Sequence, residues 1–538
     1  MRSAADAELH AGHLTAALEG PDLVDVRWGG LDVASRIQVT VRDPDWGTVA
    51  ATLVDRRIDR TDGGSRVEID ASHHDDAIAF SWHGSIEANR DGELTFAIDG
   101  RAERDFDYRR IGICVLHPWR TYVGARYEAT TEAGPAHGTF PQEIAPQLRR
   151  GDTFLPLIPA FTDLAVRFHD DVVAELAFEG ELFELEDQRN WTDPSFKTYP
   201  TPLERSEPRT MRARDRVTQQ MTLRLKGTRP AIARVRDPAE TVVVRLLEPA
   251  GRRMPDVGTS AAVGRVADPA HLRVEVAAGR RTPAAIIDAA ASGVPLEVAI
   301  LVNEERDDVR WLEPVLADVP VARVLVHLAN GDTTPSTVVR AIRKQLEDVT
   351  GAARFVGGTA SGFSELNREP PEGGDLDAIA FAISPEVHAT DERSLMGTLE
   401  IQAQVVGQAR VLGRGVAVVV SPVRMRAHAG TPFADAWTIG SLAALADAEV
   451  ASITCDTSVR ALATVAELRG LELAEVSVSH PDRIAALAAR DASDPRGSIT
   501  MIVANLTPSP QAFRLGEEAQ PPLGPYEVRT LSGDAASW

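Results

Sequence analysis

Two apolar runs in the middle of the chain decide the fold: residues 296–302 read Leu-Glu-Val-Ala-Ile-Leu-Val and residues 321–328 read Val-Ala-Arg-Val-Leu-Val-His-Leu. Near-continuous apolar runs of this length are typical of strands buried on both faces of a parallel sheet. Similar runs, two of them shorter, occur at residues 241–247, 272–276, 354–356, 378–383, 415–420 and 451–454. Ala-, Leu- and Arg-rich stretches that favour helices lie between them, at 283–290, 337–346, 394–412 and 438–448. Eight strand–helix units over about 240 residues predict a (β/α)8 TIM-like barrel at residues 236–490, with a doubly wound sheet as the alternative.

The segments on either side of this barrel have the pattern of antiparallel β-structure. Alternating runs recur at 36–41, 49–54, 66–69 and 94–98, and turn signals such as Asp62-Gly63-Gly64 separate them. Residues 1–235 are therefore predicted to form an antiparallel β-sandwich. Residues 491–538 return to short strands and predict a small C-terminal β module. The chain as a whole is predicted to be multidomain, α/β plus β.

Composition limits the classes of partner. An apolar content of 43% and a charged content of 25% are typical of a folded globular protein. The formal charge of -22 argues against nucleic acid and against anionic membranes as partners. The sequence contains no run of about 18 apolar residues, so no transmembrane helix is predicted. The first eight residues lack the apolar core of a signal peptide. Two cysteines, Cys114 and Cys455, indicate a reducing compartment, so a cytoplasmic location is expected and a homo-oligomer is left open.

Residues 183–199 read Phe-Glu-Leu-Glu-Asp-Gln-Arg-Asn-Trp-Thr-Asp-Pro-Ser-Phe-Lys-Thr-Tyr and mix charges, amides and aromatic rings. This mixture suits a pocket for a small, hydroxyl-rich, anionic ligand. The residues expected to bind substrate there are Glu186, Asp187, Asn190, Trp191, Asp193 and Lys197. A structural salt-bridge corner between two domains is an equally weighted alternative.

The ends of the predicted barrel strands supply the second set of candidates, since active sites of such barrels lie at the carboxyl ends of the strands. In Gly357-Gly-Thr-Ala-Ser-Gly-Phe-Ser-Glu-Leu-Asn-Arg368, Glu365 and Asn367 could present a base and a hydroxyl-binding amide to one cavity; alternatively, Glu365 only starts a helix. His388 follows the sixth strand and could shuttle a proton, with Glu386 or Asp391 orienting it. Asn303 and Glu275 are further strand-end candidates for substrate binding.

No metal or other cofactor is predicted. His10-x-x-His13 and His73-His-Asp-Asp76 have metal-like composition, but neither has a third and fourth ligand at an interpretable spacing.

Several of these segments resemble the D-apionate lactonase family, which acts on the lactone of a branched-chain sugar acid. The similar stretches are residues 112–118, 138–141, 144–146, 183–199, 357–368, 381–391 and 418–423. The resemblance implies a β N-terminal module, a barrel and a small β C-terminal piece. It also implies hydrolysis of D-apionolactone to D-apionate in bacterial apiose catabolism, with a small-molecule sugar-acid lactone as ligand.

Lactone opening needs an activated water, stabilisation of the oxyanion and a proton for the leaving alkoxide. We expect Glu365 to be the base and His388 the acid. Arg189 or Lys197 is expected to stabilise the oxyanion. A glycoside hydrolase, which would need two carboxylates flanking the scissile bond, is the alternative enzyme. The segment Thr454-Cys-Asp-Thr457 departs from the family pattern, which keeps a non-catalytic carbohydrate-binding relative as a further alternative.

Overall fold

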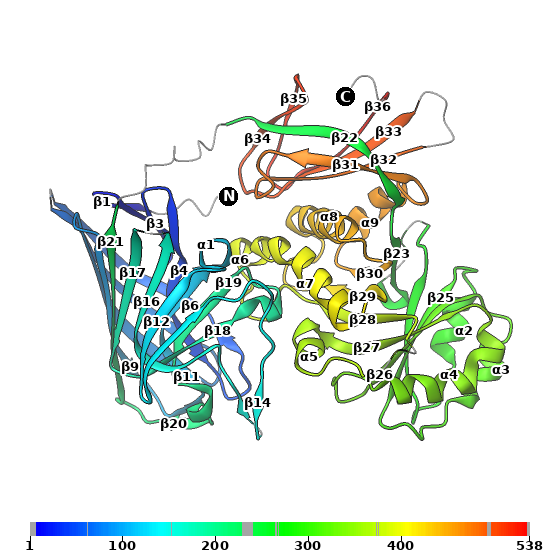
Figure 1. Cartoon of the computed structure of the whole chain (residues 1–538), viewed down its shortest axis with the longest axis horizontal. Helices are drawn as coiled ribbons and strands as arrows, with labels where there is room; N and C mark the ends of the chain where they lie inside the picture. Colours follow the sequence, from blue (N-terminus) through cyan, green and yellow to red (C-terminus); the bar gives the residue numbers. More distant parts are fainter. Residues whose placement is uncertain are drawn as a thin grey trace. The chain divides into compact units, whose positions relative to one another are not determined.

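The chain divides into two units by its internal contacts (Figure 1). Asn190–Asp193 groups with the second unit although both flanking segments belong to the first. The first unit is Met1–Arg189 with Pro194–Pro238, and the second is Asn190–Asp193 with Ala239–Trp538. The computed structural model describes residues 7–534, except for 62, 152, 170, 229–239, 264, 265, 267, 373, 375 and 492–496. The predicted domain boundary at residue 235 lies outside the described residues.

The first unit is built on a seventeen-stranded sheet whose strand pairings are antiparallel over the described residues. Its apolar side chains alternate along the strands and meet in one core that includes Phe96, Ile98 and Phe183. The strands are β1 (Ala7–Ala11), β2 (Leu14–Glu19), β3 (Asp22–Trp28), β4 (Leu31–Arg42), β5 (Thr48–Val49), β6 (Ala51–Thr61), β7 (Gly64–His74), β8 (Ala79–Asn89), β9 (Glu93–Ala102), β11 (Arg110–Pro118), β12 (Arg126–Thr131), β13 (Gly134–Thr139), β16 (Ile158–His169), β17 (Val172–Glu179), β18 (Phe183–Asp187), β19 (Ser195–Pro200) and β21 (Arg216–Gly227). The alternating runs predicted as strands fall in β4, β5–β6, β7 and β9.

Two short ribbons and three helical turns complete the first unit. One ribbon pairs β10 (Phe106–Tyr108) with β20 (Arg209–Met211), and the other pairs β14 (Arg149–Arg150) with β15 (Thr153–Phe154). The helical elements are α1 (Trp119–Tyr122), η1 (Gln188–Trp191), whose last two residues group with the second unit, and η2 (Leu203–Arg205).

Eight parallel strands close into a barrel in the second unit. They are β23 (Asp256–Ser260), β24 (Leu272–Ala277), β25 (Leu296–Val302), β26 (Val321–Leu328), β27 (Arg354–Gly362), β28 (Ala378–Ile383), β29 (Ala417–Arg424) and β30 (Ser452–Asp456). Helical segments follow the strands in chain order: η3 (Ala261–Val263), α2 (Ala284–Ala290), η4 (Arg310–Leu312), α3 (Glu313–Leu316), α4 (Ser336–Thr350), α5 (Phe363–Arg368), α6 (Glu392–Gly397), α7 (Leu399–Leu412), α8 (Pro432–Asp447) and α9 (Val459–Ala466). In the described residues, only the 3-10 turn η3 lies between β23 and β24. Small and branched side chains fill the interior: Ala299, Leu325, Val356, Ala378, Ala380 and Val419.

The prediction that residues 241–247 form the first strand of the barrel is wrong. These residues lie in β22 (Val242–Arg253), which pairs with strands outside the barrel, and β23 is the first barrel strand instead. β23 could not be predicted from the sequence pattern, because Asp256-Val-Gly-Thr-Ser260 is not an apolar run. Gly258 is required there, since a Cβ atom would lie 2.4 Å from the carbonyl oxygen of His271.

A seven-stranded sheet combines β22 with strands that follow the barrel in sequence. Its members are β22, β31 (Glu472–Val478), β32 (Ile484–Arg490), β33 (Ser498–Asn505), β34 (Gln511–Leu515), β35 (Glu518–Leu523) and β36 (Val528–Asp534). β31 and β32 thus join this sheet although the sequence assigned residues up to 490 to the barrel. Helix α8 contacts β32 and β33 of the sheet as well as α7 and α9. Because it has neighbours on several sides, it is buried nearly all round, including Trp437 and Thr438.

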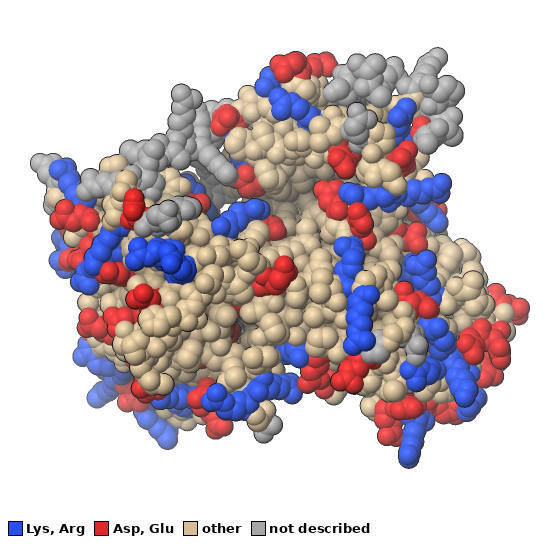
Figure 2. Space-filling model, viewed as in Figure 1, with Lys and Arg blue, Asp and Glu red and all other residues tan. Residues whose placement is uncertain are grey.

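Acidic and basic side chains are interspersed over the face seen in Figure 2. No helix in the described part of the chain is long and apolar enough to cross a membrane.

Candidate functional site

The carboxyl end of β27 leads directly into the short helix α5, which carries Glu365, Asn367 and Arg368. Gly358 makes the close packing of this strand possible: its φ is 99°, and a Cβ atom would lie 2.1 Å from the carbonyl oxygen of Ala380. Arg368 Nη1 lies 2.5 Å from Glu365 Oε1, three residues earlier on the helix. The Glu365 carboxylate, 24% exposed, is therefore held beside a cation at the strand end.

The segment Asn190–Asp193 meets the same strand ends within the second unit. Asn367 Nδ2 donates a 2.8 Å hydrogen bond to Asn190 Oδ1, and both side chains are buried. His388, after β28, has its Nδ1 2.5 Å from Asp193 Oδ2. Two of the sequence-predicted barrel residues, Asn367 and His388, are thus in direct contact with the polar–aromatic segment.

Trp191 lies between the two parts of this arrangement. The Arg368 guanidinium is 5.7 Å from the centre of the Trp191 ring, within cation–π range. On the other side, the Trp191 and His388 rings meet edge to face with their centres 5.5 Å apart. A continuous series of contacts therefore runs from Glu365 through Arg368, Trp191 and His388 to Asp193. We call these five residues the strand-end cluster.

His388 has a partner that the sequence analysis did not name for it, Asp193. Glu386 accepts hydrogen bonds from the backbone amides of Arg426 and Ala427, and Asp391 caps α6 by accepting one from the Ser394 amide. His388 pairs with Asp193. A residue 195 positions away could not be chosen from local sequence. Arg368 was also missed, although its i, i+3 spacing from Glu365 on one helix was a usable signal.

Arg189 has a different environment, inside the first unit. Its side chain is 0% exposed and forms an ion pair with Asp187 Oδ2 at 2.7 Å. Its remaining donors bond to the carbonyl oxygens of Pro141, Gln142 and Glu143 at 2.9–3.0 Å. Asp187 in turn accepts a bond from the Ala145 amide. Arg189 thus has a structural ion pair within the first unit, whereas the salt-bridge corner weighed for residues 183–199 was one between two domains.

Glu186 and Lys197 face each other in the β18–β19 register and are both buried in the first unit. Next to them Glu184 lies 2.7 Å from Arg110. Burial and the charge of Glu186 raise the pKa of Glu184 to about 8, in spite of the Arg110 guanidinium. This strand pair thus concentrates ionisable groups in the core of the first unit.

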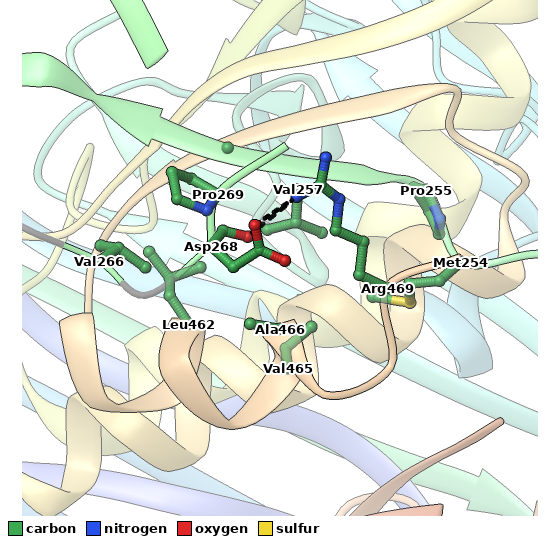
Figure 3. A pocket seen from close by; sticks show the side chains of 11 residues that line it. Met254, Pro255, Val257, Val266, Asp268, Pro269, Leu462, Val465, Ala466 and Arg469 are labelled. Atoms are coloured by element: carbon green, nitrogen blue, oxygen red, sulfur yellow. Dashed lines mark hydrogen bonds and ion pairs between the residues drawn. The ribbon is translucent and has the colours of Figure 1, made fainter. Parts of the chain in front are cut away.

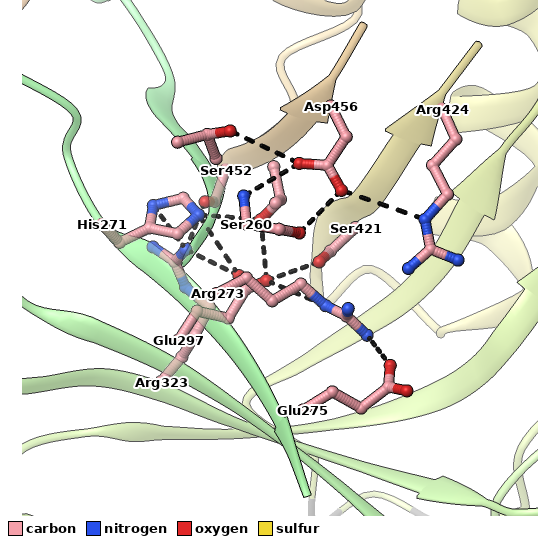
Figure 4. Close-up of polar contacts among 12 residues, drawn as sticks. Ser260, His271, Arg273, Glu275, Glu297, Arg323, Ser421, Arg424, Ser452 and Asp456 are labelled. Carbon is pink, nitrogen blue, oxygen red and sulfur yellow. Dashed lines mark hydrogen bonds and ion pairs between the residues drawn. The ribbon is translucent and has the colours of Figure 1, made fainter. Parts of the chain in front are cut away.

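The interior of the barrel holds a second polar group, centred on the fully buried Glu297 (Figure 4). Arg323 Nη1 lies 3.0 Å from Glu297 Oε2, and Thr454 Oγ1 donates a 2.7 Å bond to Oε1. Ser421 also bonds to Glu297, and His271 Nε2 lies 3.5 Å from it. Burial opposes ionisation, but the charges of His271 and Arg323 and the two hydroxyl donors outweigh it, so the pKa of Glu297 is lowered.

The strand-end candidates Glu275 and Asn303 are more exposed than Glu365. Glu275, whose side chain is 43% exposed, forms a 2.8 Å ion pair with Arg273 (Figure 4). Asn303 is exposed immediately after β25. Asp456, at the end of β30, accepts bonds of 2.8 and 2.6 Å from the amide and hydroxyl of Ser260 at the end of β23. Polar side chains therefore surround the mouth on several strands.

A small pocket between β23 and α9 lies apart from these residues (Figure 3). Its walls are mostly apolar, and a 2.8 Å ion pair between Arg469 and Asp268 borders it. Its volume of about 20 Å³ accommodates roughly one water molecule, so it is too small for a sugar lactone. Among the described residues, no three His, Cys, Asp or Glu side chains are grouped to hold a metal ion.

Comparison with known proteins gives one consistent family. Family models described as the N-terminal domain, the TIM barrel domain and the C-terminal immunoglobulin-like domain of D-apionate lactonase match residues 2–228, 252–430 and 481–531. The D-apionate lactonase of Brucella anthropi is 30% identical over 428 residues, which cover 73% of this chain and 68% of that protein.

Solved structures are more distant. A GH30 endoxylanase from Clostridium papyrosolvens C71 is 10% identical with a TM-score of 0.37, covering 55% of this chain and 100% of that one. A putative aldose 1-epimerase from Escherichia coli K12 is 9% identical with a TM-score of 0.27, covering 41% and 98%. These scores are too low to carry an argument about fold or activity.

Proposed function

The chain belongs to the D-apionate lactonase family, and from that membership we propose that it is a lactonase, a carboxylic-ester hydrolase that opens D-apionolactone to D-apionate. The glycoside-hydrolase alternative is not favoured, because the three domain matches and the Brucella relative all point to a lactonase. We class the barrel as (β/α)8 and the first unit as an antiparallel sandwich. We place the reaction in the cytoplasm, in keeping with two buried, unpaired cysteines.

The strand-end cluster supports a specific mechanism. Glu365 takes a proton from a water molecule, and the water oxygen forms a bond to the ester carbonyl carbon. The tetrahedral intermediate then collapses with cleavage of the ring C–O bond, and His388 gives a proton to the leaving alkoxide. The observation that carries this assignment is the series of contacts that joins Glu365 and His388 through Arg368 and Trp191.

The other members of the cluster have supporting parts. Asp193 holds His388 Nδ1 and so orients the ring. Arg368 pairs with the base and stabilises the developing oxyanion, a part first expected of Arg189 or Lys197. Trp191 offers its ring to the apolar face of the sugar, and the paired amides of Asn190 and Asn367 orient the hydroxyl-binding surface.

Replacement of Glu365 by Gln tests the proposal most directly. With D-apionolactone as substrate and D-apionate formation as the readout, we expect kcat to fall about 100-fold or more at unchanged Tm. The matched control is Glu372→Gln, an exposed carboxylate a few residues further along, which should keep wild-type turnover. Near-wild-type kcat in Glu365→Gln would remove the assigned base, whereas no turnover by the wild-type protein would remove the proposed activity.

A further inference from the structure

Arg424 is a half-exposed cation at the carboxyl end of β29 that the mechanism above does not use. Its side chain is 43% exposed, and its Nε lies 3.9 Å from Asp456 Oδ2, beyond hydrogen-bonding distance (Figure 4). The guanidinium donates no hydrogen bond to any residue that the structure describes. An arginine has five N–H donors in a fixed fork, so this side chain has donors to offer to a ligand at the barrel mouth.

A β-bulge in β29 turns Arg424 towards the interior of the barrel. Between Val420 and Val423 the register of β29 shifts by one residue against both of its neighbours, β28 and β30. Val419, before the shift, belongs to the interior core, so strict alternation would turn Arg424, five residues later, to the outside. The extra residue reverses the alternation, and Arg424 pairs in register with Asp456 on β30. Paired residues of neighbouring strands point to the same face of a sheet.

Asp456 is the acceptor half of this pair, and Ser260 fixes its position. Thr454, two residues earlier on β30, bonds to Glu297 in the barrel interior, so Asp456 also points inward. Its carboxylate, 10% exposed, accepts bonds of 2.8 and 2.6 Å from the Ser260 amide and hydroxyl and one of 3.4 Å from Thr259. A carboxylate has about four acceptor positions, so Asp456 is held rigidly and can still accept a bond from a further donor.

The pair lies at the same mouth as the strand-end cluster. β29 pairs directly with β28, the strand that precedes His388. The Glu386 carboxylate, two residues before His388, accepts hydrogen bonds of 2.9 and 2.5 Å from the amides of Arg426 and Ala427, just after Arg424. The segments that follow β28 and β29 are therefore tied together, and His388 and Arg424 belong to neighbouring parts of one rim.

We propose that Arg424 and Asp456 form a hydroxyl-binding position, which holds one hydroxyl of the sugar lactone while its ester group lies at the strand-end cluster. The assignment rests on the proposed lactonase function. A hydroxyl both donates and accepts, so its oxygen can bridge the 3.9 Å gap by donating to Asp456 Oδ2 and accepting from the Arg424 Nε–H. A carbonyl or carboxylate oxygen has no proton to donate to Asp456. Arg424 and Asp456 are thus specificity-determining residues that select a hydroxyl.

Comparison of two lactones tests this position, because γ-butyrolactone has the cyclic ester and no hydroxyl. We expect Arg424→Met and Asp456→Asn to lower kcat/KM for D-apionolactone about tenfold to 100-fold, the loss typical of a hydrogen bond to a charged group. Their kcat/KM for γ-butyrolactone should stay at the wild-type value. The matched control is Arg354→Met, an exposed arginine at the amino end of β27, which should leave both values unchanged. Arg424 is half-exposed, so Arg424→Met preserves folding even where Asp456→Asn disturbs the contact with Ser260.

Calorimetric titration with D-apionate supplies a second readout, which decides the test if the wild-type protein does not turn over γ-butyrolactone. The product keeps the hydroxyls of the lactone, so folded variants should bind it about tenfold to 100-fold more weakly. Equal losses on both lactones, or unchanged kcat/KM for D-apionolactone and unchanged D-apionate affinity, would overturn this position and leave the lactonase function standing. No turnover of either lactone by the wild-type protein would overturn the lactonase function and this position with it.

Discussion

Replacing Glu297 by Gln should destabilise the barrel strongly, because it removes the negative charge that the two buried guanidinium groups of Arg273 and Arg323 share. Glu297 is 0% exposed, and its carboxylate lies 3.0 Å from Arg323 and 3.8 Å from Arg273. Gln has nearly the same shape, so the loss reflects charge and not a cavity. Breaking a buried ion pair by removing one partner costs about 3–5 kcal/mol.

The magnitude converts into a measurable shift in thermal unfolding. At about 2 °C per kcal/mol for a domain of this size, the barrel-containing unit should lose about 6–10 °C in Tm. Differential scanning calorimetry of the full chain measures this shift, and the transition of the first unit serves as an internal reference. Glu517→Gln is the matched control, since Glu517 also pairs with an arginine at 3.0 Å but is 86% exposed.

The two outcomes separate burial from mere charge pairing. An exposed pair contributes about 0–1 kcal/mol, so Glu517→Gln should move Tm by no more than about 2 °C. If Glu297→Gln lowered Tm by no more than this control, the carboxylate would not be compensating the buried guanidinium groups, and our account of the barrel interior would be refuted.

Three further predictions follow from particular contacts. Asp193→Asn should lower kcat about 100-fold with little change in KM, and it should shift the pH profile of kcat, because the ring of His388 loses the negative charge of Asp193. A lower Tm with an unchanged pH profile would instead show that Asp193 has only a structural role. The pKa of Glu184 is raised from 4.5 to about 8, so between these pH values the native state keeps a proton that the unfolded chain loses. The contribution of this proton to the stability of the first unit is therefore complete below about pH 4.5 and is lost as pH rises through about 8. Glu184→Gln should therefore flatten the decline of first-unit stability across this range in urea titrations. Gly358→Ala should destabilise the barrel by about 1–3 kcal/mol in the same assay, since its φ is 99° and the new Cβ would meet the Ala380 carbonyl; an unchanged midpoint would contradict this reading.

Local patterns were sufficient for most of the secondary structure. The apolar runs at 296–302 and 321–328 coincide with β25 and β26, and the helical stretch at 337–346 lies inside α4. These elements were predictable because the pattern of apolar residues in a strand buried on both faces, or in an amphipathic helix, directly reflects which of its faces are buried. The same logic failed for β23, where close packing of Gly258 on His271 replaces an apolar run.

Assignment of strands to sheets required the tertiary structure. Residues 241–247 form a strand as expected, but they join a sheet whose other members lie more than 200 residues later, through the pairing of β22 with β31 and β34. An apolar run specifies that a strand is buried and leaves its neighbours open. Partner choice depends on side chains from distant segments.

The same division holds for the candidate site. The sequence by itself determined which residue types could do the chemistry, and it singled out Glu365, Asn367 and His388 at strand ends and Asn190–Asp193 in one polar–aromatic segment. Only the tertiary structure decided that Asp193 lies against His388, and that Arg189 is occupied by Asp187 and three carbonyl oxygens. The physical reason is that composition sets what a side chain can bond to, whereas burial and distance, which arise from the packing of segments far apart in the chain, set what it does bond to.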